Sequence, residues 1–216
     1  MTKIIHCADL HLDSPMETHT TEEQASIRTT EIIHTSLRLT ESAAKNDVRA
    51  VIIAGDMFDG ERIKIRTVDE ILDAIRRTPN VDYLYLAGNH DGATYAFADH
   101  DMPDNLKIFG KEWKTYKYDS VAISGVEICE ANSQSLYLQV PHENGVANIV
   151  TLHGQAGVVS GVDQVNISKL KNKGIDYLAL GHIHTYAEQT LDGKGIYCYS
   201  GCLEGRGFDE CGPKGF

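Results

Sequence analysis

Short apolar runs that end in small polar clusters recur through this sequence, and they constrain its fold more than any other feature. The run Val51–Ile53 leads into Ala54-Gly55-Asp56-Met57-Phe58-Asp59, and four other runs end in a similar way. Those four clusters are Asp9-Leu10-His11, Gly88-Asn89-His90-Asp91, His153-Gly154 and Gly181-His182-Ile183-His184. Apolar runs of this length are typical of buried strands, and α/β sheets bind ligands beyond the carboxyl ends of their strands. The pattern therefore predicts an α/β fold with one polar site assembled from several strand ends.

The first half of the chain alternates between predicted strands and predicted helices. Strands are expected at Lys3–Ala8, Val51–Ala54 and Asp82–Ala87. Thr20 and Glu23 have the spacing of a capping box for a helix that runs to about Lys45. A second helix carries apolar residues at helical spacing from Val68 to Ile75 and ends at Pro79. This order predicts parallel strands joined by right-handed crossovers.

The middle of the chain consists of short runs with turn-like breaks, which indicates antiparallel strands in a second sheet. These runs are Leu106–Gly110, Trp113–Tyr118 and Val121–Cys129. The expected elements that follow are strands at Asn148–Leu152 and Tyr177–Leu180, a helix at Val165–Lys173, a hairpin of Tyr186–Leu191 with Gly195–Tyr199, and a loop at Gly201–Gly215. We expect a two-sheet β-sandwich flanked by helices, in one domain of residues 1–216 without a capping domain.

The polar clusters supply carboxylate, amide and imidazole groups, which together suit divalent metal ions. Five of the ten His follow strands and stand beside Asp, Asn or Gly, a placement that packing alone does not explain. A two-residue step on extended backbone would aim Asp9 with His11, and His182 with His184, at one site. We predict that Asp56 bridges two ions, an arrangement that recurs in enzymes that attack phosphorus. The mixed imidazole and oxygen ligands suit manganese, iron or zinc better than an all-protein magnesium site.

No Walker loop and no Gly-x-Ser-x-Gly elbow occurs, so the expected nucleophile is water activated by metal. The formal net charge of −11 means that attraction of a polyanion must be local. The candidate cations for this are Arg62, Lys64, Arg66 and Arg206. The five Cys lack a disulfide-like framework, and no apolar run is long enough to span a membrane. We therefore expect a cytoplasmic protein without membrane contact.

The five clusters resemble those of the calcineurin-like metallophosphoesterases, in the family's order and over nearly the whole chain. Within that superfamily, Ala8–Pro15, Ala54–Asp59 and Leu180–His184 are most similar to the SbcD-type DNA-repair nuclease branch. The resemblance implies a phosphodiesterase that acts on DNA, with manganese as the usual metal for nuclease work. Because the net charge is −11 and no capping domain is expected, we expect it to act on single-stranded or frayed DNA ends rather than on intact duplex. It also implies a possible ATPase partner, and one more strand of the core beyond Phe216.

The resemblance also assigns roles to individual residues. Asp9, His11, Asp56 and His184 would hold one ion, and Asp56, Asn89, His153 and His182 would hold the other. His90 would contact the phosphate and protonate the leaving oxygen, and Asp59 would orient His90. Besides His90, Arg62 and Arg206 are the candidate substrate-binding residues.

Two other functions stay open at this point. The first is a phosphodiesterase or phosphatase that acts on small nucleotides or other phosphoesters, which the acidic composition favours. The second is a non-catalytic binding protein that keeps the fold, which the loss of a metal ligand would favour. All the ligands that the resemblance implies are present in this sequence.

Overall fold

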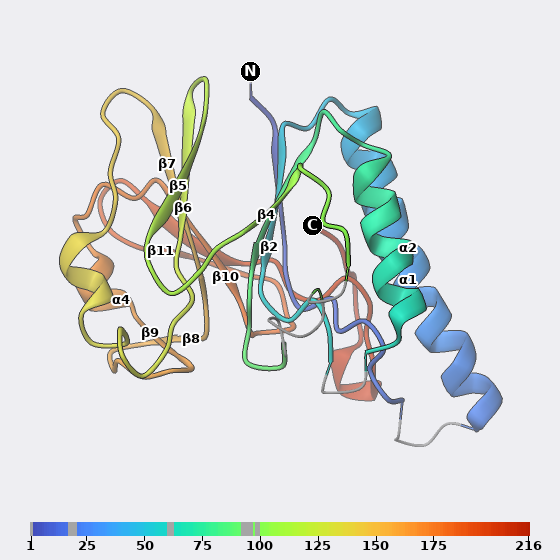
Figure 1. Ribbon diagram of the computed structural model, residues 1–216. Coiled ribbons are helices and arrows are strands. Elements are labelled where there is room, and N and C mark those ends of the chain that lie inside the picture. Colours follow the sequence, from blue (N-terminus) through green and yellow to red (C-terminus); the bar gives the residue numbers. More distant parts are fainter. Residues whose placement is uncertain (1, 17–20, 60–62, 92–96, 98–99) are drawn as a thin grey trace.

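The computed structural model describes residues 2–16, 21–59, 63–91, 97 and 100–216, arranged in layers (Figure 1). The first layer is a pair of helices, α1 (Glu22–Lys45) and α2 (Ile65–Arg76). They cover a four-stranded parallel sheet in the order β1-β2-β3-β4. Its strands are β1 (Ile4–Cys7), β2 (Ala50–Ala54), β3 (Asp82–Leu86) and β4 (Leu106–Ile108).

A six-stranded mixed sheet lies against the other face of the first sheet, in the order β11-β12-β10-β7-β6-β5. Its strands are β5 (Lys114–Tyr118), β6 (Val121–Gly125), β7 (Ala147–His153), β10 (Tyr177–Gly181), β11 (Ala187–Thr190) and β12 (Ile196–Tyr199). The smaller elements are η1 (Leu136–Gln139), the paired strands β8 (Gln155–Gly157) and β9 (Gln164–Asn166), α4 (Ile167–Leu170) and η2 (Phe208–Glu210). The predicted sandwich of two sheets with helices outside is confirmed.

Alternation along the strands divides the core into layers. On β2, Val51 and Ile53 pack against the helices, whereas Ile52 packs against the second sheet. Successive strand residues point to opposite faces, so one short run of apolar residues fills both sides of the sheet. A third cluster, which includes Val150 and Leu178, fills the outer face of the second sheet. The first sheet is therefore buried on both faces.

Several predicted details differ from the structure. The capping box of α1 is formed by Thr21 with Gln24, one residue later than predicted, and Thr20 lies outside the described residues. The predicted strand at Leu106–Gly110 belongs to the first sheet, where β4 pairs parallel with β3. Of the three runs in the middle of the chain, β5 and β6 form an antiparallel pair, but β6 pairs parallel with β7. The predicted hairpin is confirmed, because β11 and β12 pair antiparallel. Apolar runs show that a segment is a strand but do not show which sheet it joins.

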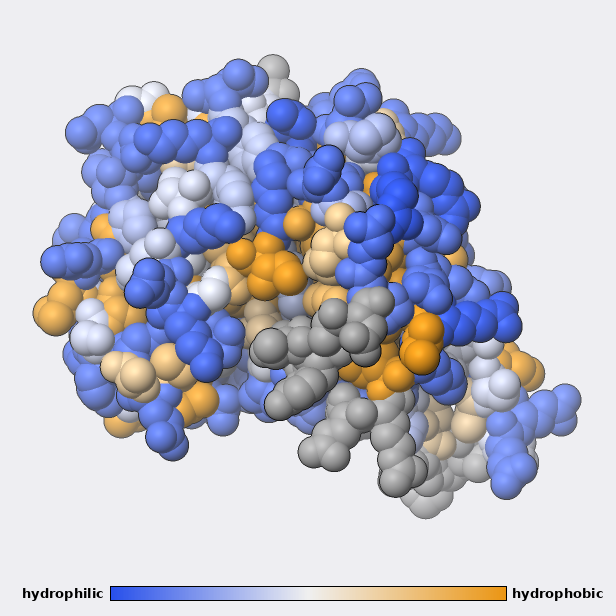
Figure 2. All heavy atoms as spheres, viewed as in Figure 1, coloured by the Kyte–Doolittle hydropathy of each residue, from blue (hydrophilic) through white to orange (hydrophobic). Residues whose placement is uncertain are grey.

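The predicted helix at Val165–Lys173 is also wrong in extent. Asn166 caps a single helical turn by accepting a hydrogen bond from the backbone of Lys169, and the turn ends where Asn172 takes a φ of 59°. Among the described residues, none of the helices has both the length and the apolar character needed to cross a membrane. The face shown in Figure 2 is mainly hydrophilic, with apolar side chains in separate patches.

Candidate metal centre

The five predicted polar clusters meet at one edge of the two sheets. Asp9, Asp56 and Asn89 follow the parallel strands β1, β2 and β3, and the carboxyl ends of these strands lie side by side. His153 ends β7 and His182 follows β10, and these two strands of the facing sheet are also parallel. Because the two sheets face each other, side chains from both enter the same space. The fold thus brings together residues that are up to 175 positions apart in the sequence, from Asp9 to His184.

We had predicted extended backbone for the residues that carry these side chains. Instead, the backbone is left-handed at several of them. Asp9, His11, Asp56 and His182 have φ values of 53°, 48°, 51° and 102°. This region costs a residue with a side chain roughly 1–2 kcal/mol, and such strain is concentrated at functional sites. Backbone hydrogen bonds hold the first two loops together, from Asp9 N to Gly55 O at 3.0 Å and from His11 N to Asp56 O at 2.9 Å.

Two glycines allow the loops to approach each other. A Cβ atom on Gly88 would lie 2.2 Å from Oδ1 of Asp56, and a Cβ atom on Gly55 would lie 2.0 Å from Nδ1 of His153. Gly55 also has a φ of 97°, which residues with side chains rarely adopt. Glycine is required at both positions because the side chains of the centre occupy the space that a larger residue would need.

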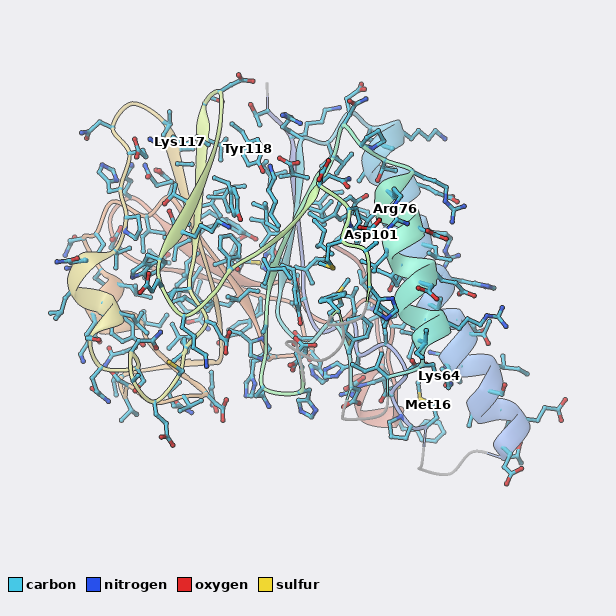
Figure 3. The ribbon with its side chains drawn as sticks, viewed as in Figure 1. Met16, Lys64, Arg76, Asp101, Lys117 and Tyr118 are labelled. Atoms are coloured by element: carbon cyan, nitrogen blue, oxygen red, sulfur yellow. The ribbon has the colours of Figure 1, made fainter. Side chains whose placement is uncertain are left out.

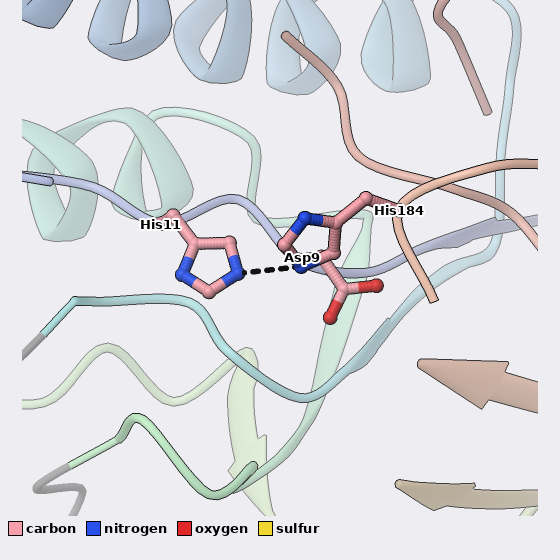
Figure 4. A group of neighbouring side chains, drawn as sticks. All are labelled: Asp9, His11 and His184. Atoms are coloured by element: carbon pink, nitrogen blue, oxygen red, sulfur yellow. Dashed lines mark hydrogen bonds between the residues drawn. The ribbon is translucent and has the colours of Figure 1, made fainter. Parts of the chain in front are cut away.

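Asp9, His11 and His184 form the first group of potential ligands, with one ligand atom of each within 4.8 Å of the others. Figure 4 shows the two imidazoles turned toward each other, with 3.1 Å between Nε2 of His11 and Nε2 of His184. Two ligands that each lie ~2.1 Å from one ion at right angles would be ~3 Å apart. The spacing of the two nitrogens therefore fits a shared metal ion.

Asn89, His153 and His182 form the second group. Oδ1 of Asn89 lies 2.9 Å from Nε2 of His153 and 3.1 Å from Nδ1 of His182. Oδ2 of Asp56 lies between the two groups, 3.4 Å from Nε2 of His153 and 3.8 Å from Nε2 of His11. One carboxylate oxygen is thus within reach of two ligand sets, and the donor chemistry and spacing fit a pair of divalent ions.

Burial and mutual contacts set the charges of these groups. Burial raises the pKa of the Asp9 carboxyl to about 6. Burial and the nearby Arg206 guanidinium lower the pKa of His11 to about 3. Burial opposes the charges of Asp56 and His153, but their contact lowers the pKa of Asp56 to about 2 and raises that of His153 to about 9. Asp56 is therefore an anion at neutral pH, as a bridging ligand must be.

His90 and Asp59 lie beside the two groups. The backbone N–H of His90 donates to Oδ1 of Asp56 at 2.9 Å, which fixes its loop to the centre. Its half-exposed imidazole places Nδ1 3.0 Å from Oδ1 of Asp59. The other oxygen of Asp59 accepts from Oγ of Ser14 at 2.7 Å and from the Arg206 guanidinium at 2.9 Å. Burial favours the neutral form of the Asp59 carboxyl. Its hydrogen bonds and the positive charge of Arg206 outweigh burial and hold the pKa of Asp59 below its usual range.

Arg206 is thus placed at the centre, but its guanidinium already contacts carboxylates. It pairs with Asp59 at 2.9 Å and with Glu210 at 3.4 Å. Two other candidate cations have acidic partners as well, since Lys64 pairs with Asp13 at 3.3 Å and Arg66 with Glu70 at 2.8 Å. Arg62 lies outside the described residues, so its predicted role in substrate binding stays a prediction.

Two acidic residues of the centre had no predicted role. Asp91 accepts hydrogen bonds from the backbone of Phe58 and of Gly88, both at 2.8 Å, and so joins the loops that follow β2 and β3. Burial raises the pKa of Asp91 to about 6. Glu210 lies 2.5 Å from Nδ1 of His184 and orients that imidazole. Asp91 belongs to the predicted polar cluster Gly88-Asn89-His90-Asp91, whereas the Gly-rich sequence around Glu210 did not indicate a functional residue.

Comparison with known proteins identifies the family and the fold. The family profile described as calcineurin-like phosphoesterase matches residues 2–186. A dimetal phosphatase from Danio rerio has a similar fold, with a TM-score of 0.57 and 11% identity over 93% of this chain and 87% of its own.

The relatives found by sequence are longer than this chain. The uncharacterized metallophosphoesterase YhaO of Bacillus subtilis is 27% identical over 98% of this chain and 55% of its own length. The DNA double-strand break repair protein Mre11 of Sulfurisphaera tokodaii is 26% identical over 89% of this chain and 51% of its own. The chain thus spans about half the length of these curated relatives.

Proposed function

This chain belongs to the calcineurin-like phosphoesterase family, and on that premise we propose that it is a two-metal phosphodiesterase of the SbcD type that cleaves DNA. Asp9, His11 and His184 would hold one ion, and Asn89, His153 and His182 the other, with Asp56 between them. Manganese is the proposed metal, because mixed oxygen and imidazole ligands suit it better than magnesium.

The position of the Asp56 carboxylate is the observation that carries the proposal. Its Oδ2 atom lies 3.8 Å from the first group, at His11, and 3.4 Å from the second, at His153. Two divalent ions held in this way orient a phosphate, lower the pKa of water and offset the charge of the leaving oxygen. The arrangement supports hydrolysis at phosphorus rather than a structural role for metal, because structural sites are usually single and closed.

His90 supplies the proton for the leaving oxygen in this proposal. Oδ1 of Asp59 accepts a hydrogen bond from Nδ1–H of His90 at 3.0 Å, so Nε2 is the atom left to face the substrate. The exposed fraction of the His90 side chain is 47%, whereas that of His11 is 0%. His90 is therefore accessible to a phosphodiester, and Asp59 positions it.

DNA is the proposed substrate because several sequence relatives are named DNA double-strand break repair protein Mre11. An ATPase partner is proposed from the resemblance of the motifs to the SbcD-type branch, and residues 1–216 are proposed to form one domain. A reducing cytoplasm fits the five cysteines, all of which are free.

Hydrolysis of end-labelled DNA tests the proposal. The manganese-loaded protein should degrade a single-stranded oligonucleotide and frayed ends, handle intact duplex poorly, and lose activity in a chelator. Cyclic and linear dinucleotides should be poorer substrates. A small-nucleotide phosphodiesterase is the second candidate, because the net charge of −11 repels a polyanion. Robust turnover of dinucleotides without cleavage of any oligonucleotide would establish it instead.

A further inference from the structure

A hollow beside the metal centre is not used by the mechanism above. It has a volume of about 390 Å³, and the residues that matter here are Met16, Arg28, Arg206, Phe208, Glu210 and Lys214. Figure 3 shows Met16 at the same end of the molecule as η2. The hollow therefore adjoins the centre through Arg206 and Glu210, which contact Asp59 and His184.

Phe208 lies at this hollow with its ring in solvent. Its exposed fraction of 83% exceeds that of Leu138 at 76% and Val158 at 78%, the next most exposed large apolar residues among those described. A Phe gains roughly 1.5–3 kcal/mol when it is fully buried, so exposure of the ring gives that stabilisation up. An aromatic residue held in this way is available to a ligand.

The segment that carries Phe208 is fixed to the centre rather than loosely attached. Glu210 accepts from the backbone N–H of Arg206 at 2.7 Å and contacts Nδ1 of His184 at 2.5 Å. The Arg28 guanidinium donates to the carbonyl of Gly205 at 2.8 Å. The position of the ring is therefore coupled to that of a metal ligand.

The charge of the hollow differs from that of the whole protein. Arg28, Arg206 and Lys214 line it beside Glu204 and Glu210, so cationic groups are gathered here although the net charge is −11, and Arg28 and Arg206 are held in place by ion pairs with carboxylates. Aromatic faces beside cations are the usual platform for bases of single-stranded nucleic acid. This chemistry suits a nucleoside with its phosphate.

The order of the residues shows which nucleoside would lie there. His90 contacts one oxygen of Asp59, and Arg206 contacts the other. His90 gives its proton to the leaving oxygen in the proposed function, so Arg206 and Phe208 lie on the leaving-group side. We propose that Phe208 stacks on the base of the nucleoside that leaves, with Arg206 between that base and the metal centre. This inference rests on the proposed function, which it extends to the substrate.

The test compares Phe208→Ala and Phe208→Trp with Leu138→Ala, a matched loss of an exposed apolar side chain on η1. Substrates are a single-stranded oligonucleotide, the same oligonucleotide with an abasic residue on the leaving side, and bis-p-nitrophenyl phosphate. Loss of one base–aromatic stack should lower kcat/KM for the oligonucleotide roughly 10-fold more than for the small diester. Phe208→Trp should restore it, and Leu138→Ala should behave as wild type. The abasic substrate should remove the difference between wild type and Phe208→Ala.

Equal losses on both substrates, or a loss that persists with the abasic residue, would overturn the stacking role. A second measurement separates this failure from failure of DNA cleavage itself. In chelator, the fluorescence of a 2-aminopurine nucleotide should be quenched by the wild type and not by Phe208→Ala. Identical quenching would refute the inference even where no oligonucleotide is cleaved. Quenching without oligonucleotide cleavage would keep the stack and reject only the DNA substrate.

Discussion

The two halves of the metal centre are oriented by different parts of the molecule. In the second group, Nδ1 of His153 donates to the carbonyl of Ala54 at 2.9 Å, so the backbone of β2 fixes the ring. In the first group, Nδ1 of His184 contacts the Glu210 side chain at 2.5 Å, and Nδ1 of His11 makes no hydrogen bond to a described residue. Core strands therefore hold the second half, whereas the segment around η2 supports the first.

The difference indicates that the two ions would respond differently to mutation. A ring held by backbone inside a buried sheet changes only when the fold changes. A ring held by one side chain outside the sheets can be loosened while the fold stays intact, and such outer contacts typically contribute 10–100-fold in metal affinity. The first half is thus the tunable one, and the predictions below test this asymmetry.

The largest effect is expected for Asp56→Asn, which would remove the carboxylate that lies between the two groups. The affinity for both ions should fall together, and the activation free energy of hydrolysis should rise by several kcal/mol. Metal content by mass spectrometry gives the occupancy. Asp82→Asn is the control, because Asp82 is also buried and hydrogen-bonded, to Lys107 and Tyr118, but starts β3 at its other end. Two equivalents of metal retained in Asp56→Asn would contradict the bridging role.

His90→Ala should leave both metal sites occupied and still slow hydrolysis by roughly 10²–10⁴-fold, as loss of a general acid does. The loss should be smaller for a nitrophenolate leaving group, which needs little protonation. His100→Ala is a matched control, because His100 contacts Asp69 at 3.0 Å just as His90 contacts Asp59. Equal losses with good and poor leaving groups would show that His90 only positions the phosphate.

Glu210→Gln tests the asymmetry directly. We expect one ion to bind 10–100-fold more weakly while the other keeps its affinity, because His184 is the one proposed metal ligand that contacts Glu210 among the described residues. Calorimetric titration and the visible spectrum of the cobalt-loaded protein separate the two sites. Glu204→Gln is the control, since Glu204 lies in the same segment and pairs with Arg28 at 3.5 Å. A parallel weakening of both ions would mean that the halves are not independently supported.

The same division explains what sequence could predict. The clusters at strand ends identified Asp56, Asn89 and His153 because strand and ligand are adjacent in the chain. The support of His184 by Glu210 was not predictable, since it joins positions 26 apart through a Gly-rich segment without periodicity. Left-handed backbone at Asp9 and His11 was also missed, because Asp and His do not indicate it as Gly does.

Affinity for DNA should depend only weakly on salt. Lys64, Arg66 and Arg206 each pair with an acidic side chain, so few cations are available to displace counterions. With about two phosphates neutralised, the slope for a single strand would be about −1.4, or roughly sevenfold between 50 and 200 mM. Fluorescence anisotropy measures it. Lys64→Glu, compared with Lys194→Glu in the turn before β12, shows whether the residues near α2 contribute. A steep slope would contradict this expectation and indicate a basic DNA-binding surface formed by other lysines and arginines of the chain.

The smallest effect concerns two histidines with opposite pKa shifts, of which His153 is buried and His6 is partly buried. Asp56 raises the pKa of His153 to about 9, whereas burial lowers that of His6, on β1, to about 4. His6 contacts the Tyr177 hydroxyl at 2.9 Å and pairs with no carboxylate among the described residues. Its folded pKa lies below the unfolded value of 6.5, so the unfolded chain binds more protons between pH 6.5 and 4. The contribution of neutral His6 to the free energy of unfolding is therefore present above pH 6.5 and is lost as the pH falls toward 4.

Chemical unfolding of the metal-free protein across this range should show the loss, and His6→Gln should flatten it. Because the His6 residue is only partly buried, we expect a change of about 1 kcal/mol rather than the full linkage value. Histidines at the metal centre also titrate, so the difference between the variant and wild type is the quantity that matters. An unchanged pH dependence in His6→Gln would show that His153 and its neighbours account for the acid sensitivity. His6 and His153 would then differ only in their proposed part in metal binding.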